Sequence, residues 1–212
     1  MIWVLYAQLG EMLPPQAWQR YFVEMPRSVQ SAISRYLRWQ DRQAGLFGKL
    51  LLAEGLARCG YPREHLRNLV WDCAGRPFLG CRMDFNISHS GGYVVCALCP
   101  GGRVGIDIEQ IRAIDISDFK AQMTCEQWAE IMASDHRLAT FFRLWTQKES
   151  VVKADGRGIA APMDDITIAG EKAFIADDIW GMTEVGIADG YCCHLATREI
   201  KPAIRIEKIV LC

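Results

Sequence analysis

Helix-like and strand-like segments are interspersed along this chain of 212 residues, and their mixed order constrains the fold more than any other sequence feature. Apolar residues at helical spacing predict a long helix over residues 28–59, with Gly60 at its end. Residues 104–109 alternate in the way that is typical of a strand. Helices and strands mixed in this order favour an α+β fold.

The remaining segments extend the mixed pattern. They predict strands at 1–9, 69–71, 84–88, 93–98, 165–169, 172–176, 191–197 and 204–211, and helices at 14–25, 125–134 and 136–154. Gly92-Tyr93 and Gly190-Tyr191 each precede an apolar run, and this echo indicates two similar halves. We expect the halves to be residues 1–102 and 103–212, with a site at the seam between them.

The composition excludes several classes of protein. Half of the residues are apolar and the net charge is −1, so neither nucleic acid nor an anionic membrane is an expected partner. No apolar run reaches the roughly 20 residues of a membrane helix, and no basic leader precedes the first strand. The nine cysteines are odd in number and several lie in or beside apolar stretches, which favours free thiols. We expect a cytoplasmic monomer.

Asp107 and Glu109 form the first candidate site. On a strand the side-chain period is two, so both carboxylates point to one face and Ile108 to the other. Two carboxylates at this spacing can share a hard divalent cation. The alternative interpretation is a solvated face on an edge strand, which the apolar flanking residues make less favourable.

The helix predicted at 136–154 carries the second candidate site. Trp145, Glu149 and Lys153 recur at i, i+4 and i+8 and therefore share one stripe. Glu149 is a candidate third metal ligand, and Lys153 a candidate phosphate-binding cation. The alternative is an ordinary surface ion pair beside a core tryptophan.

The third candidate site is the run Ser88-His89-Ser90-Gly91-Gly92, which offers hydroxyl, imidazole and backbone donors to phosphate oxygens. The Gly-x-Ser-x-Gly pattern of hydrolases is absent, and so is the phosphate-binding loop of standard ATP sites. The residues together predict Mg²⁺-dependent transfer from a phosphorylated donor.

Four motifs, in this order and spacing, resemble the surfactin-type (Sfp-type) 4′-phosphopantetheinyl transferases. They are Gly75-Arg76-Pro77, Phe85-Asn86-Ile87-Ser88-His89-Ser90, Gly105-Ile106-Asp107-Ile108-Glu109 and Trp145-x-x-Lys148-Glu149-Ser150-x-x-Lys153. The resemblance implies a pseudo-dimer of two similar α/β halves with the active site in the cleft between them. It also implies a holo-[acyl-carrier-protein] synthase type of enzyme, which transfers phosphopantetheine from coenzyme A to a serine of an apo acyl or peptidyl carrier protein and releases adenosine 3′,5′-bisphosphate.

The resemblance further assigns roles to residues. Mg²⁺, with Mn²⁺ as an alternative, would be held by Asp107, Glu109 and Glu149, and the catalytic residues would be Glu149 and Lys153. Coenzyme A would be bound by Arg42, Gly75, Arg76, Pro77, Ser88, His89 and Lys153.

The chain departs from the family pattern at three places. The positively charged residue that usually follows the Ser-His-Ser-Gly run is absent, since Gly92-Tyr93 follows Gly91. Family members often bind the 3′-phosphate through basic residues before and within the long N-terminal helix, where this chain has Val29, Ala32 and Ala44. The replacements open to this chain are Arg35, Arg38, Arg42 and Lys49. Some members also carry a glutamate base where this chain has Gln127, which leaves Glu126, Glu149 or a metal-bound water as the base.

Two further questions stay open at this stage. Apolar residues between Ile111 and Gln127, including Phe119 and Met123, predict a carrier-docking surface that continues onto the helix starting near Cys125 or, alternatively, side chains packed under a loop. Which carrier is modified, that of a fatty-acid, polyketide or peptide synthetase, does not follow from the sequence. The rival functions are a binding module without catalysis and a hydrolase that cleaves the coenzyme A pyrophosphate.

Overall fold

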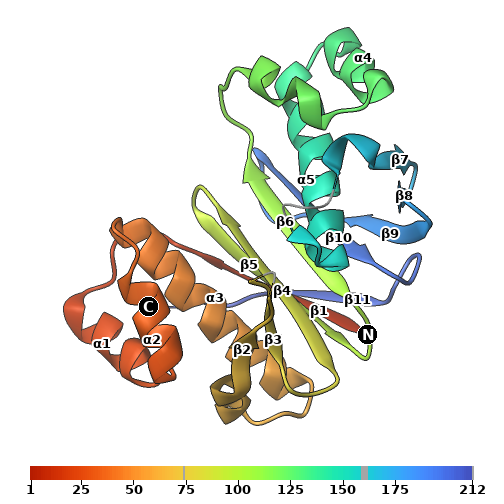
Figure 1. Cartoon of the computed structure of the whole chain (residues 1–212). Coiled ribbons are helices and arrows are strands. Elements are labelled where there is room, and N and C mark those ends of the chain that lie inside the picture. Colours follow the sequence, from red (N-terminus) through yellow and green to blue (C-terminus); the bar gives the residue numbers. More distant parts are fainter. Residues whose placement is uncertain (74, 159–161, 212) are drawn as a thin grey trace. The chain divides into compact units, whose positions relative to one another are not determined.

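A computed structural model describes residues 1–73, 75–158 and 162–211 of the chain (Figure 1). Its internal contacts divide it into two compact units. Unit 1 consists of Met1–Gly101 together with Ile204–Cys212, and unit 2 is the continuous segment Gly102–Ala203. The segment from residue 204 onward, which the sequence analysis assigns to the second half, therefore packs in unit 1.

Unit 1 is built on a four-stranded sheet in the order β11-β1-β5-β4. Its strands are β1 (Ile2–Gln8), β4 (Met83–Ser90), β5 (Tyr93–Pro100) and β11 (Ile204–Lys208). β1 runs parallel to β11 and antiparallel to β5, and β5 runs antiparallel to β4. The first strand of the chain is therefore hydrogen-bonded on one side to a strand more than 190 residues away, since Ile2 pairs with Ile204.

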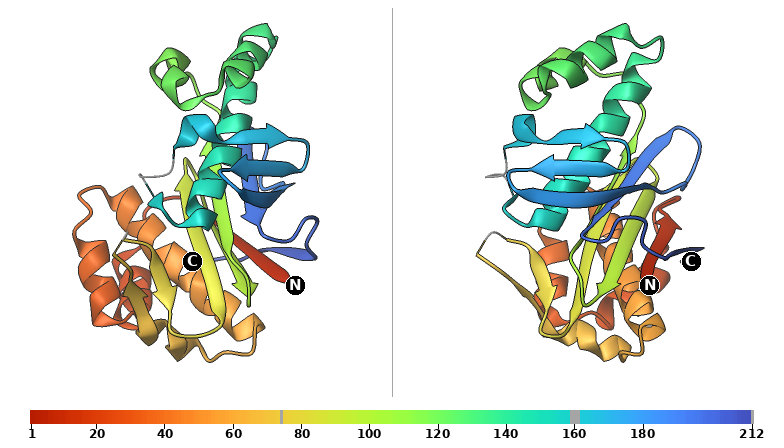
Figure 2. Two further views of the ribbon diagram at one scale, coloured as in Figure 1. Left: turned by 45° about the vertical axis from the view of Figure 1, so that its right-hand side comes forward. Right: turned by 90° about the vertical axis from the view of Figure 1, so that its right-hand side faces the viewer.

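Unit 1 has three α-helices, α1 (Pro15–Val23), α2 (Arg27–Ser34) and α3 (Trp39–Arg58). α3 packs on the sheet, and α1 and α2 pack on α3. α3 lies along β5 and β1, and its leucines form the centre of the core of unit 1 (Figure 2). A 3₁₀ helix (Arg63–Asn68) and the small hairpin of β2 (Leu69–Trp71) and β3 (Pro77–Leu79) then connect α3 to β4.

Unit 2 is built on a five-stranded antiparallel sheet in the order β6-β10-β9-β8-β7. Its strands are β6 (Val104–Gln110), β7 (Thr167–Ala169), β8 (Lys172–Ile175), β9 (Asp178–Glu184) and β10 (Tyr191–Thr197). α5 (Arg137–Asp155) packs on β6 and β10 (Figure 2). The 3₁₀ helix η2 (Ile116–Gln122) and α4 (Cys125–Ala133) precede α5, and a short 3₁₀ turn (Met163–Asp165) precedes β7.

The two units share one order of elements, each considered by itself. In unit 1 the first strand β1 pairs with β5, and in unit 2 the first strand β6 pairs with β10. The tyrosines of the sequence echo occupy matching positions, because Tyr93 pairs with Gln8 and Tyr191 pairs with Gln110. In each unit the long helix packs on this pair of strands. The echo thus marks corresponding strands of two similar units.

The helix predicted over residues 28–59 is wrong as a single element, because the chain forms α2 and α3 with a break at residues 35–38. The break lets α2 fold back on α3, with Ile33 and Tyr36 against Gly45. Tyr36 lies outside both helices, and its carbonyl oxygen accepts a hydrogen bond of 2.7 Å from the Arg42 Nε. Leu37, which lies in this break, is 93% exposed.

Two strands escape sequence analysis, the three-residue β3 and the longer β9. β9 carries Gly181 at its centre, and glycine disfavours a strand unless another backbone approaches closely. Here a Cβ on Gly181 would lie 2.3 Å from the carbonyl oxygen of Glu199, so tertiary packing explains the glycine. Among the residues described, every cysteine is a free thiol, and no helix is both long and apolar enough to cross a bilayer.

Candidate active site

The acidic face of β6 is set directly against α5. Asp107 and Glu109 share this face with Gly105, as the strand period predicts. A Cβ on Gly105 would lie 2.0 Å from the carbonyl oxygen of Ser150, so only a glycine lets α5 approach the strand this closely. Asp107 is buried and Glu109 is half-buried. The two carboxylates therefore lie under the helix that carries the second candidate site.

α5 adds Glu149 and Lys153 to this face. Lys153 is bound to the Asp107 carboxylate by an ion pair and hydrogen bond. Burial raises the pKa of Glu149, the Lys153 ammonium opposes that rise, and the Asp107 and Glu109 carboxylates add to it. Burial acts to lower the pKa of Lys153, but the three carboxylates, Asp107 first, outweigh it and raise that pKa. The four side chains thus form one electrostatic cluster within unit 2.

The carboxylates of this cluster are suitable ligands for a cation, although they are not arranged as a preformed metal site. Within the described residues, no group of three or more His, Cys, Asp or Glu side chains is arranged to hold a metal ion. The positive charge beside Asp107 is the Lys153 ammonium. The donor set consists of carboxylate oxygens whose charges already act on one another, which is the chemistry that hard divalent cations select.

Apart from Lys153, the residues predicted to bind coenzyme A lie in unit 1. Gly75 and Arg76 lie between β2 and β3, where the Gly75 amide donates to the Asp72 carbonyl at 3.0 Å, and Pro77 begins β3, paired with Trp71. The Arg76 guanidinium is buried and pairs with Asp84 at 2.8 Å. Because this ion pair joins the turn to β4, the Arg76 side chain supports the surface that Gly75 and Pro77 present.

Ser88 and His89 lie near the end of β4, next to the tight turn to β5. As neighbours on a strand they point to opposite faces: Ser88 is 6% exposed, whereas His89 is exposed. The sequence analysis treats them as one phosphate-binding pair, but the strand gives them different surroundings.

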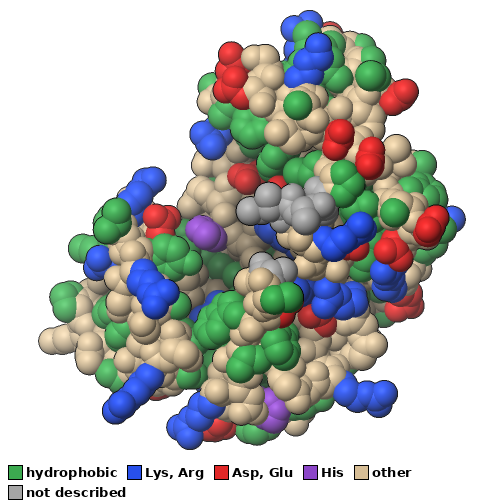
Figure 3. Space-filling view, viewed as in Figure 1, with side chains coloured by type: hydrophobic (Ala, Val, Ile, Leu, Met, Phe, Trp, Pro, Cys, Tyr) green, Lys and Arg blue, Asp and Glu red, His purple; other side chains and the backbone are tan. Residues whose placement is uncertain are grey.

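The basic residues of the helical region divide between two hollows. Arg35 lines a hollow together with Ser28, Ser31, Trp71 and Gly75. Arg42 lines another, mostly apolar hollow, whose other residues are Met12, Leu13, Pro15, Trp18, Phe22, Ile33, Ser34, Trp39 and Gln43. Figure 3 shows hydrophobic and basic side chains next to one another over the helices of unit 1. Arg35, and not Arg42, is therefore the arginine that shares a surface with the Gly75 turn.

Comparison with known proteins bears on both units. Residues 103–176 match the 4′-phosphopantetheinyl transferase superfamily, and residues 14–101 match the N-terminal region of a 4′-phosphopantetheinyl transferase. The chain is 33% identical to the 4′-phosphopantetheinyl transferase gsp of Aneurinibacillus migulanus, over 79% of this chain and 71% of that protein. The chain belongs to the 4′-phosphopantetheinyl transferase family.

Other relatives in this family include Sfp of Bacillus subtilis strain 168, which is 30% identical over 58% of this chain and 52% of that protein. The mouse L-aminoadipate-semialdehyde dehydrogenase-phosphopantetheinyl transferase is also 30% identical, over 73% of this chain and 56% of its own length. The alignments thus span between about half and seven tenths of these relatives. The predicted family, class of enzyme and α+β fold are confirmed, and coenzyme A and a carrier protein follow as substrates at the family level.

In this phosphopantetheinyl transferase the segment predicted to dock the carrier points its large side chains inward. Met123 is buried, and the Phe119 ring lies 5.1 Å from the Trp145 ring and 5.4 Å from the Phe141 ring. These side chains belong to the core cluster beneath η2 and α4. Of the two alternatives, packing under a loop therefore applies to Phe119 and Met123.

At the sequence level Lys148 is named only as part of a motif and Gln127 only as a departure from the family pattern, and neither is assigned a role. Lys148 is completely buried, and burial lowers its pKa to about 8 while Asp164 acts in the opposite direction. It shares a helix face with Phe141, Leu144 and Val151, which are buried apolar residues at i−7, i−4 and i+3. That spacing was the available signal, and it marks Lys148 as an interior residue. Gln127 is likewise buried, in the first turn of α4.

Proposed function

We propose that this chain transfers the 4′-phosphopantetheine group of coenzyme A to the serine hydroxyl of an apo acyl or peptidyl carrier protein. The serine oxygen bonds to the β-phosphorus, the bond to the bridging oxygen breaks, and adenosine 3′,5′-bisphosphate leaves. The observation that carries the proposal is the pair Asp107 and Glu109 beneath Glu149 and Lys153, in a chain of this family. Positioning and charge stabilisation supply most of the catalysis in reactions of this kind.

In this proposal Asp107, Glu109 and Glu149 hold Mg²⁺, with Mn²⁺ as the alternative. A bound divalent cation would supply positive charge to the pyrophosphate of the donor. Lys153 donates to a phosphate oxygen and stabilises the charge that develops on the leaving bisphosphate. The Glu126 carboxylate accepts hydrogen bonds from its own backbone amide and from the Thr124 hydroxyl, which lower its pKa. A lower pKa makes Glu126 a weaker base. We therefore assign the acceptance of the serine proton to Glu149.

We assign the nucleotide end of coenzyme A to the surface of the Gly75 turn. Gly75 and Pro77 lie along the adenosine, and the Trp71 ring, 43% exposed in the same hollow, offers an apolar surface to the base. Arg35 donates to the 3′-phosphate together with His89. Arg76 and Ser88 are buried, and Arg76 supports this surface through its ion pair with Asp84.

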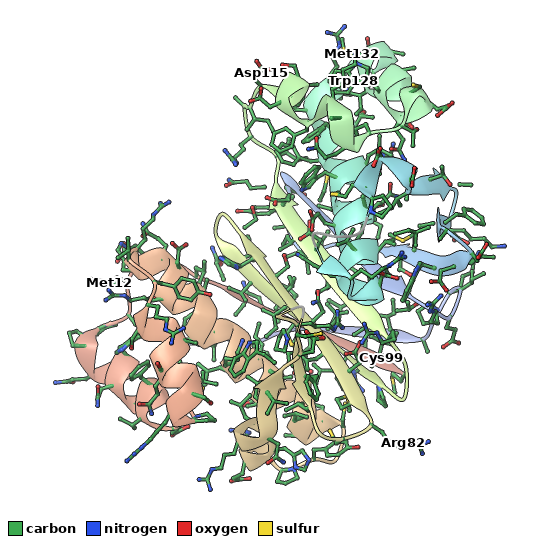
Figure 4. All side chains as sticks on the ribbon, in the orientation of Figure 1. Met12, Arg82, Cys99, Asp115, Trp128 and Met132 are labelled. Carbon is green, nitrogen blue, oxygen red and sulfur yellow. The ribbon has the colours of Figure 1, made fainter. Side chains whose placement is uncertain are left out.

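We assign carrier docking to the outer face of α4. Met132 is 41% exposed, and Trp128, one turn earlier, is half-buried against the core cluster beneath this helix (Figure 4). Cys125 and Ala129 are exposed and lie on the same stripe as Met132. Since Phe119 and Met123 pack inward, this stripe replaces them as the apolar surface on which a carrier helix can lie.

Intact-mass spectrometry of several apo carrier proteins, incubated with coenzyme A and Mg²⁺, tests the proposed function. We expect at least one carrier to gain a phosphopantetheine, the gain to stop when a chelator is added, and Asp107→Asn to abolish it while the fold survives. Coenzyme A consumed without any carrier would instead identify a hydrolase. Binding without transfer would identify a binding module, and full activity of Asp107→Asn would refute the metal assignment.

A further inference from the structure

Lys148 makes a set of contacts that the proposed chemistry does not use. Its ammonium donates to the carbonyl oxygen of Gln122 at 2.7 Å and to the side-chain oxygen of Gln127. The Met123 sulfur lies 4.0 Å from the same nitrogen. All three contacts lie between the end of η2 and the first turn of α4. Lys148 therefore attaches this connection to α5, next to the proposed metal ligand Glu149.

Gln127 continues the network on the other side. Its side-chain oxygen also accepts from the Thr124 amide at 3.0 Å, and its side-chain nitrogen donates to the Ile166 carbonyl at 3.0 Å. Its own amide donates to the Thr124 hydroxyl at 3.2 Å and completes a capping box. One glutamine thus joins the start of α4 to α5, through Lys148, and to the segment that leads into β7.

Burying an ammonium group is energetically unfavourable compared with burying an apolar group. Its removal from water costs free energy that an apolar side chain of the same length would not. The residues around it on α5, Leu144 and Val151, are apolar, so an apolar residue would suit the core. Unlike an apolar side chain, the ammonium makes directional hydrogen bonds. These bonds fix the positions of the Gln122 backbone and the Gln127 side chain relative to α5.

We propose that Lys148 and Gln127 are positioning residues that hold the docking surface of α4 in register with Glu149. The inference rests on the proposed function, since it takes the α4 stripe as the carrier surface and Glu149 as part of the catalytic cluster. Lys148 touches neither substrate. Lys148 fixes the position of α4, on which the carrier lies, relative to the Glu149 carboxylate. That carboxylate accepts the proton of the carrier serine.

The variants Lys148→Met and Gln127→Met keep the length of each side chain and remove its hydrogen bonds. We expect each to raise the KM for the carrier about tenfold while the KM for coenzyme A stays within about twofold, the size of one lost buried network bond. Because both residues act as one unit, the double variant should be little worse than either single variant. Gln147→Met is the matched control, since Gln147 is a buried amide on α5 that bonds to Arg143 outside this network.

Amide hydrogen exchange supplies a second measurement that needs no carrier and no activity. Lys148→Met should speed exchange over residues 116–133 at least about tenfold and leave β6 and unit 1 unchanged, whereas Gln147→Met should not. If the wild-type protein modifies no carrier, the proposed function fails but this result still decides whether the pair holds α4.

Three results would overturn the inference. The carrier KM and the exchange of residues 116–133 could stay unchanged in Lys148→Met, the two substrates could weaken equally, or protection could fall throughout unit 2. The last result would make Lys148 an ordinary stabilising residue. If Lys148→Met fails to fold, Gln127→Met carries the same test.

Discussion

At the scale of single residues, Arg35 and Arg42 are close in sequence but lie in different parts of the surface of unit 1. Arg35 follows α2 and shares a hollow with Gly75, whereas Arg42 lies on α3 and donates to the carbonyl of Tyr36. If Arg35 binds the 3′-phosphate, Arg35→Ala should weaken coenzyme A binding by about 1.4 kcal/mol, or tenfold. Dephospho-coenzyme A, which lacks that phosphate, should lose almost nothing.

Isothermal titration of both nucleotides against both alanine variants checks this prediction. Arg42→Ala is the matched control and should bind coenzyme A as the wild-type protein does. A tenfold loss of coenzyme A affinity in Arg42→Ala, with the affinity of Arg35→Ala unchanged, would indicate that Arg42 binds the 3′-phosphate, as the sequence predicted.

His194 gives a prediction on stability. It is buried on β10 with its Nδ1 2.7 Å from the Thr146 hydroxyl, and burial, followed by the Arg143 charge, lowers its pKa from 6.5 to about 4. Glu184 on β9 and Asp107 on β6 are its partners across the sheet. Between these pH values the unfolded chain binds a proton that the folded chain does not, so stability should fall as pH drops from 6.5 towards 4.

The loss should reach the order of 3 kcal/mol at the lower end, from the size of the shift. Urea unfolding at several pH values measures it. His194→Gln keeps a donor for Thr146 but cannot titrate, so its stability should depend less on pH over this range. Equal pH dependence in the two proteins would assign the acid sensitivity to other groups.

How far the sequence predicts the site depends on which residues follow from a simple period. The strand period placed Asp107 and Glu109 on one face, and helical spacing placed Glu149 and Lys153 on one stripe; both arrangements occur in the structure. The separation of Arg35 from Arg42 could not be predicted, because it depends on a helix break that only the packing against α3 explains.

At the scale of elements, α4 carries the prediction on the carrier. Met132→Gln should raise the carrier KM about tenfold, since Met132 is 41% exposed on this stripe and exposed methionines are typical of binding surfaces. Trp128 is left in place because it packs against the core. The KM for coenzyme A should not change. Steady-state kinetics with both substrates measures the effect, and Ile179→Gln, at an exposed apolar position on β9, is the control. Loss of affinity for both substrates would place the docking surface elsewhere.

Most elements of the fold follow from local pattern, and the exceptions share one physical cause. The capping box of α4 and the alternation of β6 are local signals, and both elements occur where they are predicted. The break at residues 35–38 and the strand around Gly181 are set instead by segments distant in sequence or by another helix. Tertiary contacts of this kind override propensity, and no window of a single sequence contains them.

At the scale of the whole molecule, β11 carries the last prediction. It pairs with β1, and the Ile209 and Leu211 side chains that follow it pack against the core of unit 1. Deleting residues 204–212 removes these contacts and exposes an edge of β1, which should cost on the order of 3 kcal/mol and promote aggregation.

Thermal unfolding and light scattering of the shortened protein check this expectation. Glu207→Gln is the control, because it removes only the ion pair with Arg58, whose solvent exposure limits its contribution to less than about 1 kcal/mol. An unchanged Tm after the deletion would mean that β1 needs no partner on this side.

The pairing of β1 with β11 also sets an order of events during synthesis. β1 leaves the ribosome first, but its partner follows only after all of residues 102–203 have been translated. At 5–20 residues per second this interval is on the order of ten seconds. A nascent chain therefore exposes one edge of its first sheet while unit 2, being continuous, can already fold, and ribosome-bound chaperones have this interval in which to bind the open edge.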